Sequence, residues 1–373
     1  MRFDGLKVAL VFDWLDGAGG GERVLYDMHV LFPDAPIYTL VYNADKAPSW
    51  LRDCDIRTTY IQKWPVLHNH HKALLQFMPR AWESLDLNEY DLVISCCSSC
   101  CKGVLTRPDA LHICYIFTPT RYLWDLYYEY RANASKLKAL VMPRVVHKVR
   151  QWDYLAAQRP DYFVSDSDFA GERVKKYYRR DVETIYPGVH INEYPIDEEP
   201  DDYYLVVSRF VRYKRIDLAI EACNKLGRKL KIIGSGGEEE KRLRELAGPT
   251  VEFMGRVSDS VMEATYSKAR AFLFPGMEDF GITPVEAMSA GVPVLAFGRG
   301  GGTETVVDGE TGRYFHEQSS DALIKCMEDF ERAGVSLSRA QIREYSKKFS
   351  QDRFYKEFAQ FAQTKLAEKG ILS

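Results

Sequence analysis

The amino-acid sequence predicts an α/β protein with two doubly wound parallel sheets, one in each of two domains. Three observations support this fold class. The chain has 373 residues, more than one ordinary hydrophobic core accommodates. Short apolar runs of strand type alternate with helical patterns along most of its length. An acidic, proline-bearing segment at residues 191–202 interrupts this alternation, as expected of an interdomain linker.

The first predicted domain, residues 1–190, opens with an apolar strand at residues 7–13, followed by a glycine-rich loop and a helix over residues 22–32. Strand, glycine loop and helix bring the backbone of α/β proteins close to a ligand phosphate or sugar. The glycines at 19–21 fit neither G-x-G-x-x-G nor a Walker A loop, so a tight turn also explains them. The later strands and helices of this domain are expected at residues 37–41, 55–59, 91–95, 111–116, 134–158, 161–166 and 169–180.

The second predicted domain, residues 191–349, repeats the alternation. A last helix over about residues 350–373 lies outside this series, and we expect it to pack back on the first domain. Because strands alternating with helices specify a parallel sheet, the loops after the strands share one carboxyl edge. The strands and helices of this domain are expected at residues 202–210, 213–226, 229–237, 238–248, 250–257, 258–269, 271–274 and 292–297.

The stretch from residue 272 to residue 297 carries the strongest functional signal. After a buried strand, Thr283 has the form of an N-cap, and Pro284 stands at the first helical position. Glu278 and Glu286 therefore flank a helix N-terminus, whose backbone N–H groups favour an anion. Glu286 has a second explanation, because it stands three residues after Thr283 and can close a capping box.

Two cations and several glycines follow the earlier strands of the second domain. Arg209 and Lys214 come just after a strand end, where they can neutralise a diphosphate. Gly234 follows the next strand, and Gly255 with Arg256 follows the one after it. Since all these loops share the carboxyl edge with Glu278 and Glu286, the sequence predicts a nucleotide-sugar pocket.

Composition excludes some classes of function. The net charge is −3, so the chain as a whole is not expected to bind nucleic acid. The eight cysteines include a run at residues 96–101, where packing of small residues at the end of a buried strand is expected and a redox motif or a metal site is the alternative. The histidines at residues 68–71 lack an acidic partner at ligand spacing, so a basic, aromatic surface for an acceptor or for lipid headgroups is expected instead. We expect no metal site.

Basic residues gather on the helical segments at 134–158 and 169–180. A solvated helix face and contact with an anionic membrane surface are both open explanations. The first 17 residues place charges on both sides of a short apolar run, so neither a signal peptide nor a membrane span is expected there. The expected location is the cytoplasm or the cytoplasmic face of a membrane.

Three motifs connect the sequence with a known family. They are S-R-F-x-x-x-K from Ser208 to Lys214, F-x-G-R-V from Phe253 to Val257, and E-x7-E from Glu278 to Glu286. AMSAGVPVLAF, GGGTETVVDGETG, YPGV, GGGERVL and TPTRYLWD also fit. With these motifs in this order over essentially the whole chain, the sequence resembles the retaining GT-B glycosyltransferases, which include bacterial sugar-polymer and lipopolysaccharide mannosyltransferases. The resemblance implies two Rossmann-like domains facing across a cleft.

The resemblance also implies roles for individual residues. Arg209 and Lys214 would bind the donor diphosphate, Glu286 the ribose hydroxyls, and Glu278 the transferred sugar. Gly255–Val257 would border the base. The full predicted set comprises catalytic Glu278, Arg209 and Lys214; donor-binding Glu286, Ser208, Gly234, Gly255, Arg256, Val257, Asp279, Phe280, Gly281, Ile282, Thr283, Gly20 and Gly21; and acceptor-side or cleft residues Arg121, Tyr122 and Phe117.

Enzymes of this family work without a metal, and arginine, lysine and a helix dipole take its role. The chain agrees with this expectation, because its sequence has no D-x-D in a strand-end loop, and Asp166-Ser167-Asp168 is the only nearby candidate. Retention by front-face attack, with the leaving phosphate helping to deprotonate the acceptor, means that the two glutamates are not a hydrolase acid/base pair. The expected partners are a nucleotide-diphospho-sugar donor and a glycan or glycolipid acceptor, with no cofactor.

One residue departs from the family pattern. Relatives with this TPxRYxWD segment often carry His immediately before Thr-Pro, where this chain has Phe117; His112, near the start of the strand, is not expected to replace it. The expected reaction is transfer of mannose from GDP-mannose to a lipid-linked or cell-surface glycan, and only the resemblance supports mannose. A UDP-sugar enzyme of the same fold and a non-catalytic sugar-binding subunit are the alternatives.

Overall fold

The structure is a computed structural model that describes residues 3, 5–64, 74–191, 196 and 199–372. The chain forms two compact units, the first from Met1–Tyr186 with Phe354–Ser373 and the second from Pro187–Arg353. The boundaries predicted from the sequence lie at 190/191 and at about 349/350. The histidines at 68–71 lie outside the described residues.

The first unit contains a seven-stranded sheet in the order β3-β2-β1-β4-β5-β6-β7, and every strand pairing in it is parallel. The strands read as apolar runs because both faces of a parallel sheet are covered by helices. They are β1 Val8–Phe12, β2 Ile37–Thr39, β3 Ile56–Thr58, β4 Leu92–Cys97, β5 Leu111–Ile116, β6 Tyr162–Ser165 and β7 Glu183–Thr184.

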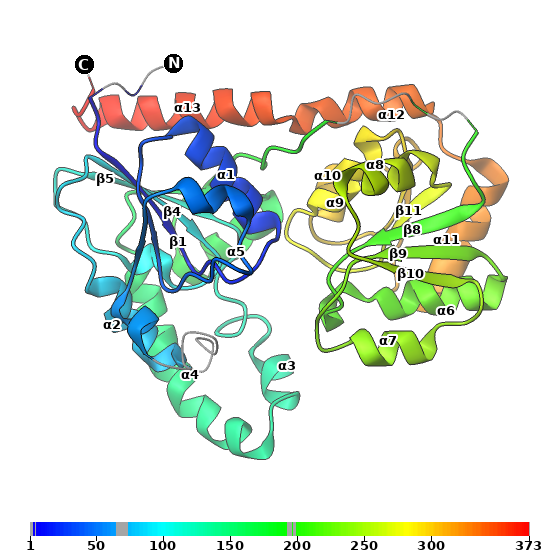
Figure 1. Ribbon diagram of the computed structural model, residues 1–373, viewed down its shortest axis with the longest axis horizontal. Coiled ribbons are helices and arrows are strands. Elements are labelled where there is room, and N and C mark those ends of the chain that lie inside the picture. The colour runs from blue at the N-terminus through cyan, green and yellow to red at the C-terminus, as the bar shows by residue number, and fades with distance from the viewer. Residues whose placement is uncertain (1–2, 4, 65–73, 192–195, 197–198, 373) are drawn as a thin grey trace. The chain divides into compact units, whose positions relative to one another are not determined.

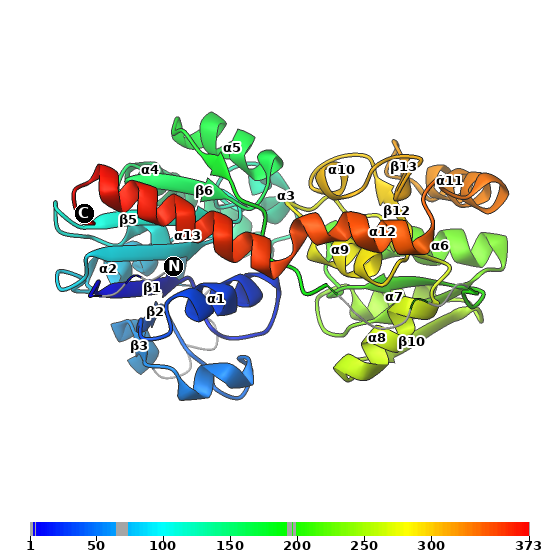
Figure 2. The same ribbon diagram turned by 90° about the horizontal axis from the view of Figure 1, so that it is seen from above.

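Helices cover both faces of this sheet (Figure 1). They are α1 Gly20–Leu31, α2 Met78–Glu83, α3 Tyr127–Ala132, α4 Lys136–Ala156, α5 Asp168–Tyr178 and α13 Gln351–Glu368. Figure 2 shows α13 lying across the sheet beside α1. Phe354, Phe358 and Leu366 of α13 are completely buried in the same core as Val24 and Leu25 of α1. The C-terminal helix is therefore part of the first unit's core.

The second unit contains a six-stranded sheet in the order β10-β9-β8-β11-β12-β13, again with parallel pairings throughout. One core cluster joins α6, α7 and α11 to one face, and α8, α9 and α12 lie on the other (Figure 1). The elements are β8 Tyr203–Val207, β9 Lys229–Ile233, β10 Val251–Gly255, β11 Ala271–Phe274, β12 Val294–Phe297, β13 Gly312–Phe315, α6 Ile216–Leu226, α7 Glu240–Leu246, α8 Asp259–Lys268, α9 Ile282–Ser289, α10 Gly302–Thr305, α11 Ser320–Ala333 and α12 Arg339–Ser346.

Each sheet has one point at which the strand order reverses. In the first unit it lies between β1 and β4, and in the second between β8 and β11. Ligands of doubly wound proteins bind outside the carboxyl ends of the strands at such a point. The loops after these four strands are therefore the places to look for a site. No helix in the part of the chain that the structure describes is long and apolar enough to cross a bilayer.

Candidate functional site

The switch point of the second unit brings together two of the three residues predicted to be catalytic. Lys214 ends the short 3₁₀ helix Arg212–Lys214 that follows β8, and Glu278 lies in the loop after β11. Their ammonium and carboxylate groups form an ion pair, and each side chain is 17% exposed. Arg209, on the loop after β8, is exposed. The site therefore presents a paired cation and carboxylate, with a further cation on the same loop as Lys214.

The loop that carries Glu278 rests on the glycine segment after β12. The backbone N–H of Gly301 donates to the carbonyl oxygen of Glu278 at 2.9 Å. A Cβ atom at position 301 would lie 2.3 Å from the carbonyl oxygens of both Asp279 and Phe280, so this close approach requires glycine. Phe280 is buried, and its ring packs on Phe349 with centroids 5.6 Å apart. The surrounding backbone therefore fixes the path of the loop.

The predicted start of the next helix is wrong. Helix α9 begins at Ile282 with Gly281 as its N-cap, and no side chain caps it. Gly281 has φ 88°, and a Cβ atom there would lie 2.8 Å from the Phe274 ring. Because glycine alone fits this left-handed turn, the helix starts before Thr283, which becomes its second residue. The capping box of Thr283 with Glu286 is therefore absent.

Glu286 instead contacts a residue that the sequence did not single out. The hydroxyl of Tyr266, on α8, donates to Glu286 Oε2 at 3.1 Å. Tyr266 is 4% exposed, whereas Glu286 is half-buried. The tyrosine holds one carboxylate oxygen in place, as a group that accepts ligand hydroxyls requires. No local pattern indicates this pairing, because the two residues lie on different helices.

Hydrogen bonds join the loops after β8, β9 and β10. The Ser208 N–H donates to the Ile233 carbonyl at 3.0 Å, and the Gly234 N–H donates to the Gly255 carbonyl at 2.9 Å. Arg256 Nε donates to Ser235 Oγ at 3.2 Å. Ser208, Gly234, Gly255 and Arg256 are thus connected along the carboxyl edge, and Val257 follows directly.

The predicted residues of the first unit lie at the carboxyl edge of its own sheet. Gly20 and Gly21 are the first residues of α1, not part of the preceding loop as expected. A Cβ atom on Gly21 would lie 3.3 Å from the Phe12 ring and 3.5 Å from the Phe117 ring. Phe117 therefore packs against the start of α1, at the place where relatives often carry His.

Arg121 and Tyr122 lie in the loop that follows β5. The Tyr122 hydroxyl is 2.5 Å from Ser99 Oγ, and burial raises the pKa of Tyr122 well above its usual range. The guanidinium of Arg173, on α5, lies close enough to Arg121 for their like charges to interact. Burial, followed by this repulsion, lowers the pKa of Arg173.

The cysteine run surrounds a carboxylate that sequence reasoning overlooked. Asp13 is 2% exposed, and its two oxygens accept the backbone N–H groups of residues 98–101 at 2.6–2.8 Å. Ligand atoms of Asp13, Cys97 and Cys101 lie within 4.8 Å of one another. Since these four N–H groups already use the carboxylate oxygens, the loop needs no ion to explain its shape.

The Asp166-Ser167-Asp168 segment and His112, near the start of β5, have structural partners. Ser167 caps α5 by accepting from the Ala170 N–H, and its own hydroxyl donates to Asp166. Thr184 Oγ1 donates to Asp168 at 2.6 Å. His112 is completely buried within β5, where its Nε2 lies 2.8 Å from Ser95 Oγ.

Comparison with known proteins adds to this geometry. The family model for glycosyl transferases group 1 matches residues 191–349. The alpha-1,3/1,6-mannosyltransferase alg2 of Schizosaccharomyces pombe is 30% identical over 366 residues, which cover 82% of this chain and 70% of the relative. The enzyme of that name from Neurospora crassa is 32% identical over 184 residues, which cover 36% of this chain but only 39% of the relative.

Among solved structures, sucrose-phosphate synthase from Thermosynechococcus elongatus superposes with a TM-score of 0.74 at 16% identity. The superposition covers 97% of this chain and 100% of that chain, and it shows the fold. Three observations indicate the same family: the two parallel sheets, the family model that matches residues 191–349, and the alignment with the Schizosaccharomyces pombe relative. The chain belongs to the glycosyl transferases group 1 family and is a glycosyltransferase of the GT-B fold.

Proposed function

We propose that the protein transfers mannose from GDP-mannose to a lipid-linked or cell-surface glycan, with retention of configuration. The observation that supports a donor site most directly is the Lys214–Glu278 ion pair at the β8/β11 switch point, with Arg209 on the same loop as Lys214. The mannose assignment is supported by the two relatives described above, both named mannosyltransferases.

In the proposed reaction, the bond between the sugar C1 and the diphosphate oxygen breaks, and a bond from C1 to the acceptor oxygen forms on the same face. The acceptor proton passes to the leaving diphosphate. Negative charge grows on the diphosphate as the bond breaks, so Arg209, Lys214 and the N-terminus of α9 stabilise the transition state. These groups supply the positive charge that a divalent cation provides in other enzymes, and we propose a metal-independent reaction.

Glu278 has two duties in this proposal. It binds hydroxyls of the donor sugar, and before the donor arrives it neutralises Lys214, whose charge would otherwise stand half-buried. The diphosphate then takes over as the partner of the lysine, which releases the carboxylate to the sugar. Glu286, held by Tyr266, binds the ribose hydroxyls. Gly20, Gly21 and Arg121 of the first unit are assigned to the donor phosphates and the acceptor.

A lipid-linked acceptor requires access to a membrane surface, and α4 has suitable chemistry for peripheral contact. Its first ten residues, 136–145, include no buried side chain and no acidic residue. Leu137 and Leu140 are 74% and 68% exposed, and basic side chains accompany them at Lys136, Lys138 and Arg144. Exposed leucines with lysines and arginines suit an anionic membrane interface, and we place the protein on the cytoplasmic face.

Thermal unfolding with a panel of donors tests the sugar nucleotide. A ligand that binds only the folded protein raises the melting temperature, so GDP-mannose should stabilise the chain more than UDP-sugars do. Stabilisation by UDP-sugars alone would overturn the mannose assignment. Transfer of radiolabelled mannose to lipid-linked acceptors then tests catalysis, and donor binding without turnover would favour the non-catalytic alternative.

A further inference from the structure

Asp153, in the last turn of α4, is a completely buried carboxylate outside the set predicted from the sequence. Its Oδ1 lies 2.5 Å from Lys102 Nζ and 3.0 Å from Thr120 Oγ1. Its Oδ2 accepts from Trp124 Nε1 and from the Tyr178 hydroxyl, each at 2.8 Å. Four donors from three parts of the first unit therefore converge on one side chain.

The residues that converge there hold the loop that follows β5, residues 117–126. Thr120 and Trp124 bond Asp153, while the Tyr122 hydroxyl lies 2.5 Å from Ser99 Oγ. Alternate side chains of the loop are thus anchored in the interior. Arg121, to which the proposed function assigns the acceptor, lies between two of these anchors and is only half-buried.

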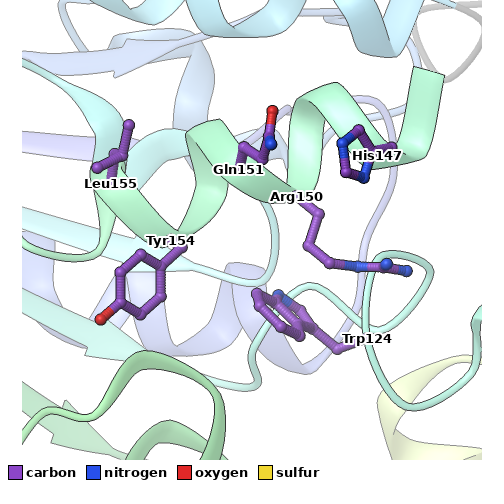
Figure 3. Close-up of a pocket in the computed structure, with 6 residues that line it drawn as sticks. All are labelled: Trp124, His147, Arg150, Gln151, Tyr154 and Leu155. Atoms are coloured by element: carbon purple, nitrogen blue, oxygen red, sulfur yellow. The ribbon is translucent and has the colours of Figure 1, made fainter. Parts of the chain in front are cut away.

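Other groups fix the same loop at Leu123 and Trp124. Figure 3 shows Arg150 reaching from α4 toward Trp124. Its Nε donates to the Leu123 carbonyl at 2.5 Å, and its guanidinium carbon lies 5.7 Å from the indole centroid. Tyr177 of α5 stacks on Trp124 with centroids 5.0 Å apart, so ring and cation both flank the indole. At the shallow hollow in Figure 3, Trp124 therefore packs against protein groups and does not offer a free face on which a sugar could stack.

A second buried carboxylate, Asp13, also helps to hold the loop at 117–126, through the backbone of Ser99. Asp13 binds the backbone N–H groups of residues 98–101, which fixes the carbonyl of Ser99. That carbonyl accepts from Lys102 Nζ at 2.6 Å and lies 2.9 Å from Thr120 Oγ1. The Thr120 hydroxyl has one proton and two acceptors, Ser99 O and Asp153 Oδ1, and so ties the loop to both carboxylate clusters.

The buried polar cluster around Asp153 fixes the geometry of the loop more than it stabilises the fold. Lys102 and Asp153 are both completely buried, and desolvating such a pair costs several kcal/mol that an apolar pair would not cost. The pair instead specifies one arrangement of the surrounding side chains, because only one geometry satisfies all four donors to Asp153. We propose that Asp153 is a positioning residue that holds the loop at 117–126 so that Arg121 faces the acceptor. This inference rests on the proposed function for the identity of the ligand.

Thr120→Val tests the proposal with the smallest change, because it removes the shared hydroxyl and keeps the shape and both buried charges. Amide hydrogen exchange on the full chain should rise about tenfold in peptides covering residues 117–126. Thr59→Val is the matched control. Thr59 is buried in the same unit, donates to the Leu40 carbonyl at 2.9 Å and accepts from the Ile61 N–H at 3.3 Å. It follows β3, which β2, β1 and β4 separate from β5 in the sheet. That variant should leave exchange at 117–126 unchanged.

In transfer assays, Thr120→Val should raise KM for the lipid-linked acceptor about tenfold and leave KM for the donor and the rate of donor hydrolysis within twofold. Trp124→Phe, which removes the bond to Asp153 Oδ2 and also shortens the ring that contacts Tyr177 and Arg150, should act in the same direction if Thr120→Val does not fold. Unchanged exchange at 117–126, or equal loss of donor and acceptor parameters, overturns the inference. If the unmodified protein shows no transfer, the proposed function fails, while the exchange data still decide whether Asp153 and its partners hold the loop.

Discussion

The ammonium group of Lys214 and the carboxylate of Glu278 form an ion pair between the loops that follow β8 and β11. Without the diphosphate, each group is the counterion of the other. The pair therefore keeps two half-buried charges neutral in the resting site, and donor binding exchanges it for a lysine–diphosphate contact.

Glu278→Gln should lower kcat about 100-fold, because an amide keeps the shape but cannot match the charge of the carboxylate at the reacting sugar. The affinity for GDP should change little or rise, since Lys214 loses its competing partner. Donor titration and initial-rate kinetics measure the two effects separately.

Glu331→Gln is the matched control for this change. Glu331 also forms an ion pair, at 2.6 Å with Arg228, but it lies on α11 away from the predicted site. Its substitution should leave kcat unchanged. Full activity in the double variant Arg209→Ala/Glu278→Gln would contradict the assignment of the site.

Tyr266→Phe should raise KM for the donor about fivefold and change kcat little. The substitution removes one hydrogen bond to Glu286. A well-formed hydrogen bond to a charged group contributes about 1.5–3 kcal/mol, which sets an upper limit for the effect. Tyr203→Phe is the control, because Tyr203 is equally buried and its hydroxyl donates to the Thr265 carbonyl at 2.7 Å. An equal rise in KM in both variants would mean that Tyr266 acts only through stability.

The sequence predicts the fold and the meeting of Lys214 with Glu278 because both follow from local patterns. Buried parallel strands are continuous apolar runs, and their loops must share one edge of the sheet. Residues just after a strand are therefore placed in space by their position in the chain. No knowledge of side-chain packing is needed to bring the two loops together.

What the sequence does not predict depends on contacts between distant segments. The start of α9 is set by Gly281 against the Phe274 ring and not by the local capping signal at Thr283. The partners Lys102 and Asp153 are 51 positions apart, and each alone resembles a solvated charge. Such pairings exist only once the core is packed.

His112 gives the first unit a measurable sensitivity to acid. Burial lowers its pKa from 6.5 to about 4, so between these values the unfolded chain binds one proton more than the folded chain. The contribution of neutral His112 to the free energy of unfolding is fully present above pH 6.5. It is lost as the pH falls toward 4, at about 1.4 kcal/mol per pH unit. Asp13 acts in the opposite direction, because burial raises its pKa to about 7 and deprotonation then destabilises the fold.

Comparison of the unmodified chain with His112→Gln isolates the histidine term, since Asp13 is common to both. Unfolding by urea, followed by circular dichroism, should show the stability of the unmodified chain relative to the variant falling by about 2 kcal/mol between pH 7 and pH 5. Parallel stability profiles for the two proteins would show that the pKa of His112 is the same in the folded and unfolded chain, and would contradict this prediction.

The thiols distinguish packing from redox or metal chemistry in the cysteine run. Seven of the eight cysteines are buried, and only Cys54 is partly exposed. Burial raises the pKa of Cys96 and Cys100 above the usual range, which lowers the fraction of reactive thiolate. At Cys97, burial is outweighed by hydrogen bonds with Cys101 and Cys114 and by the charge of Lys102, which lower the pKa, but this thiol is also buried away from solvent. A colorimetric disulfide reagent should therefore titrate at most one thiol of the native protein within minutes and all eight after denaturation. Rapid modification of two or more native thiols, or release of zinc on unfolding, would instead identify the run at 96–101 as a chemical site.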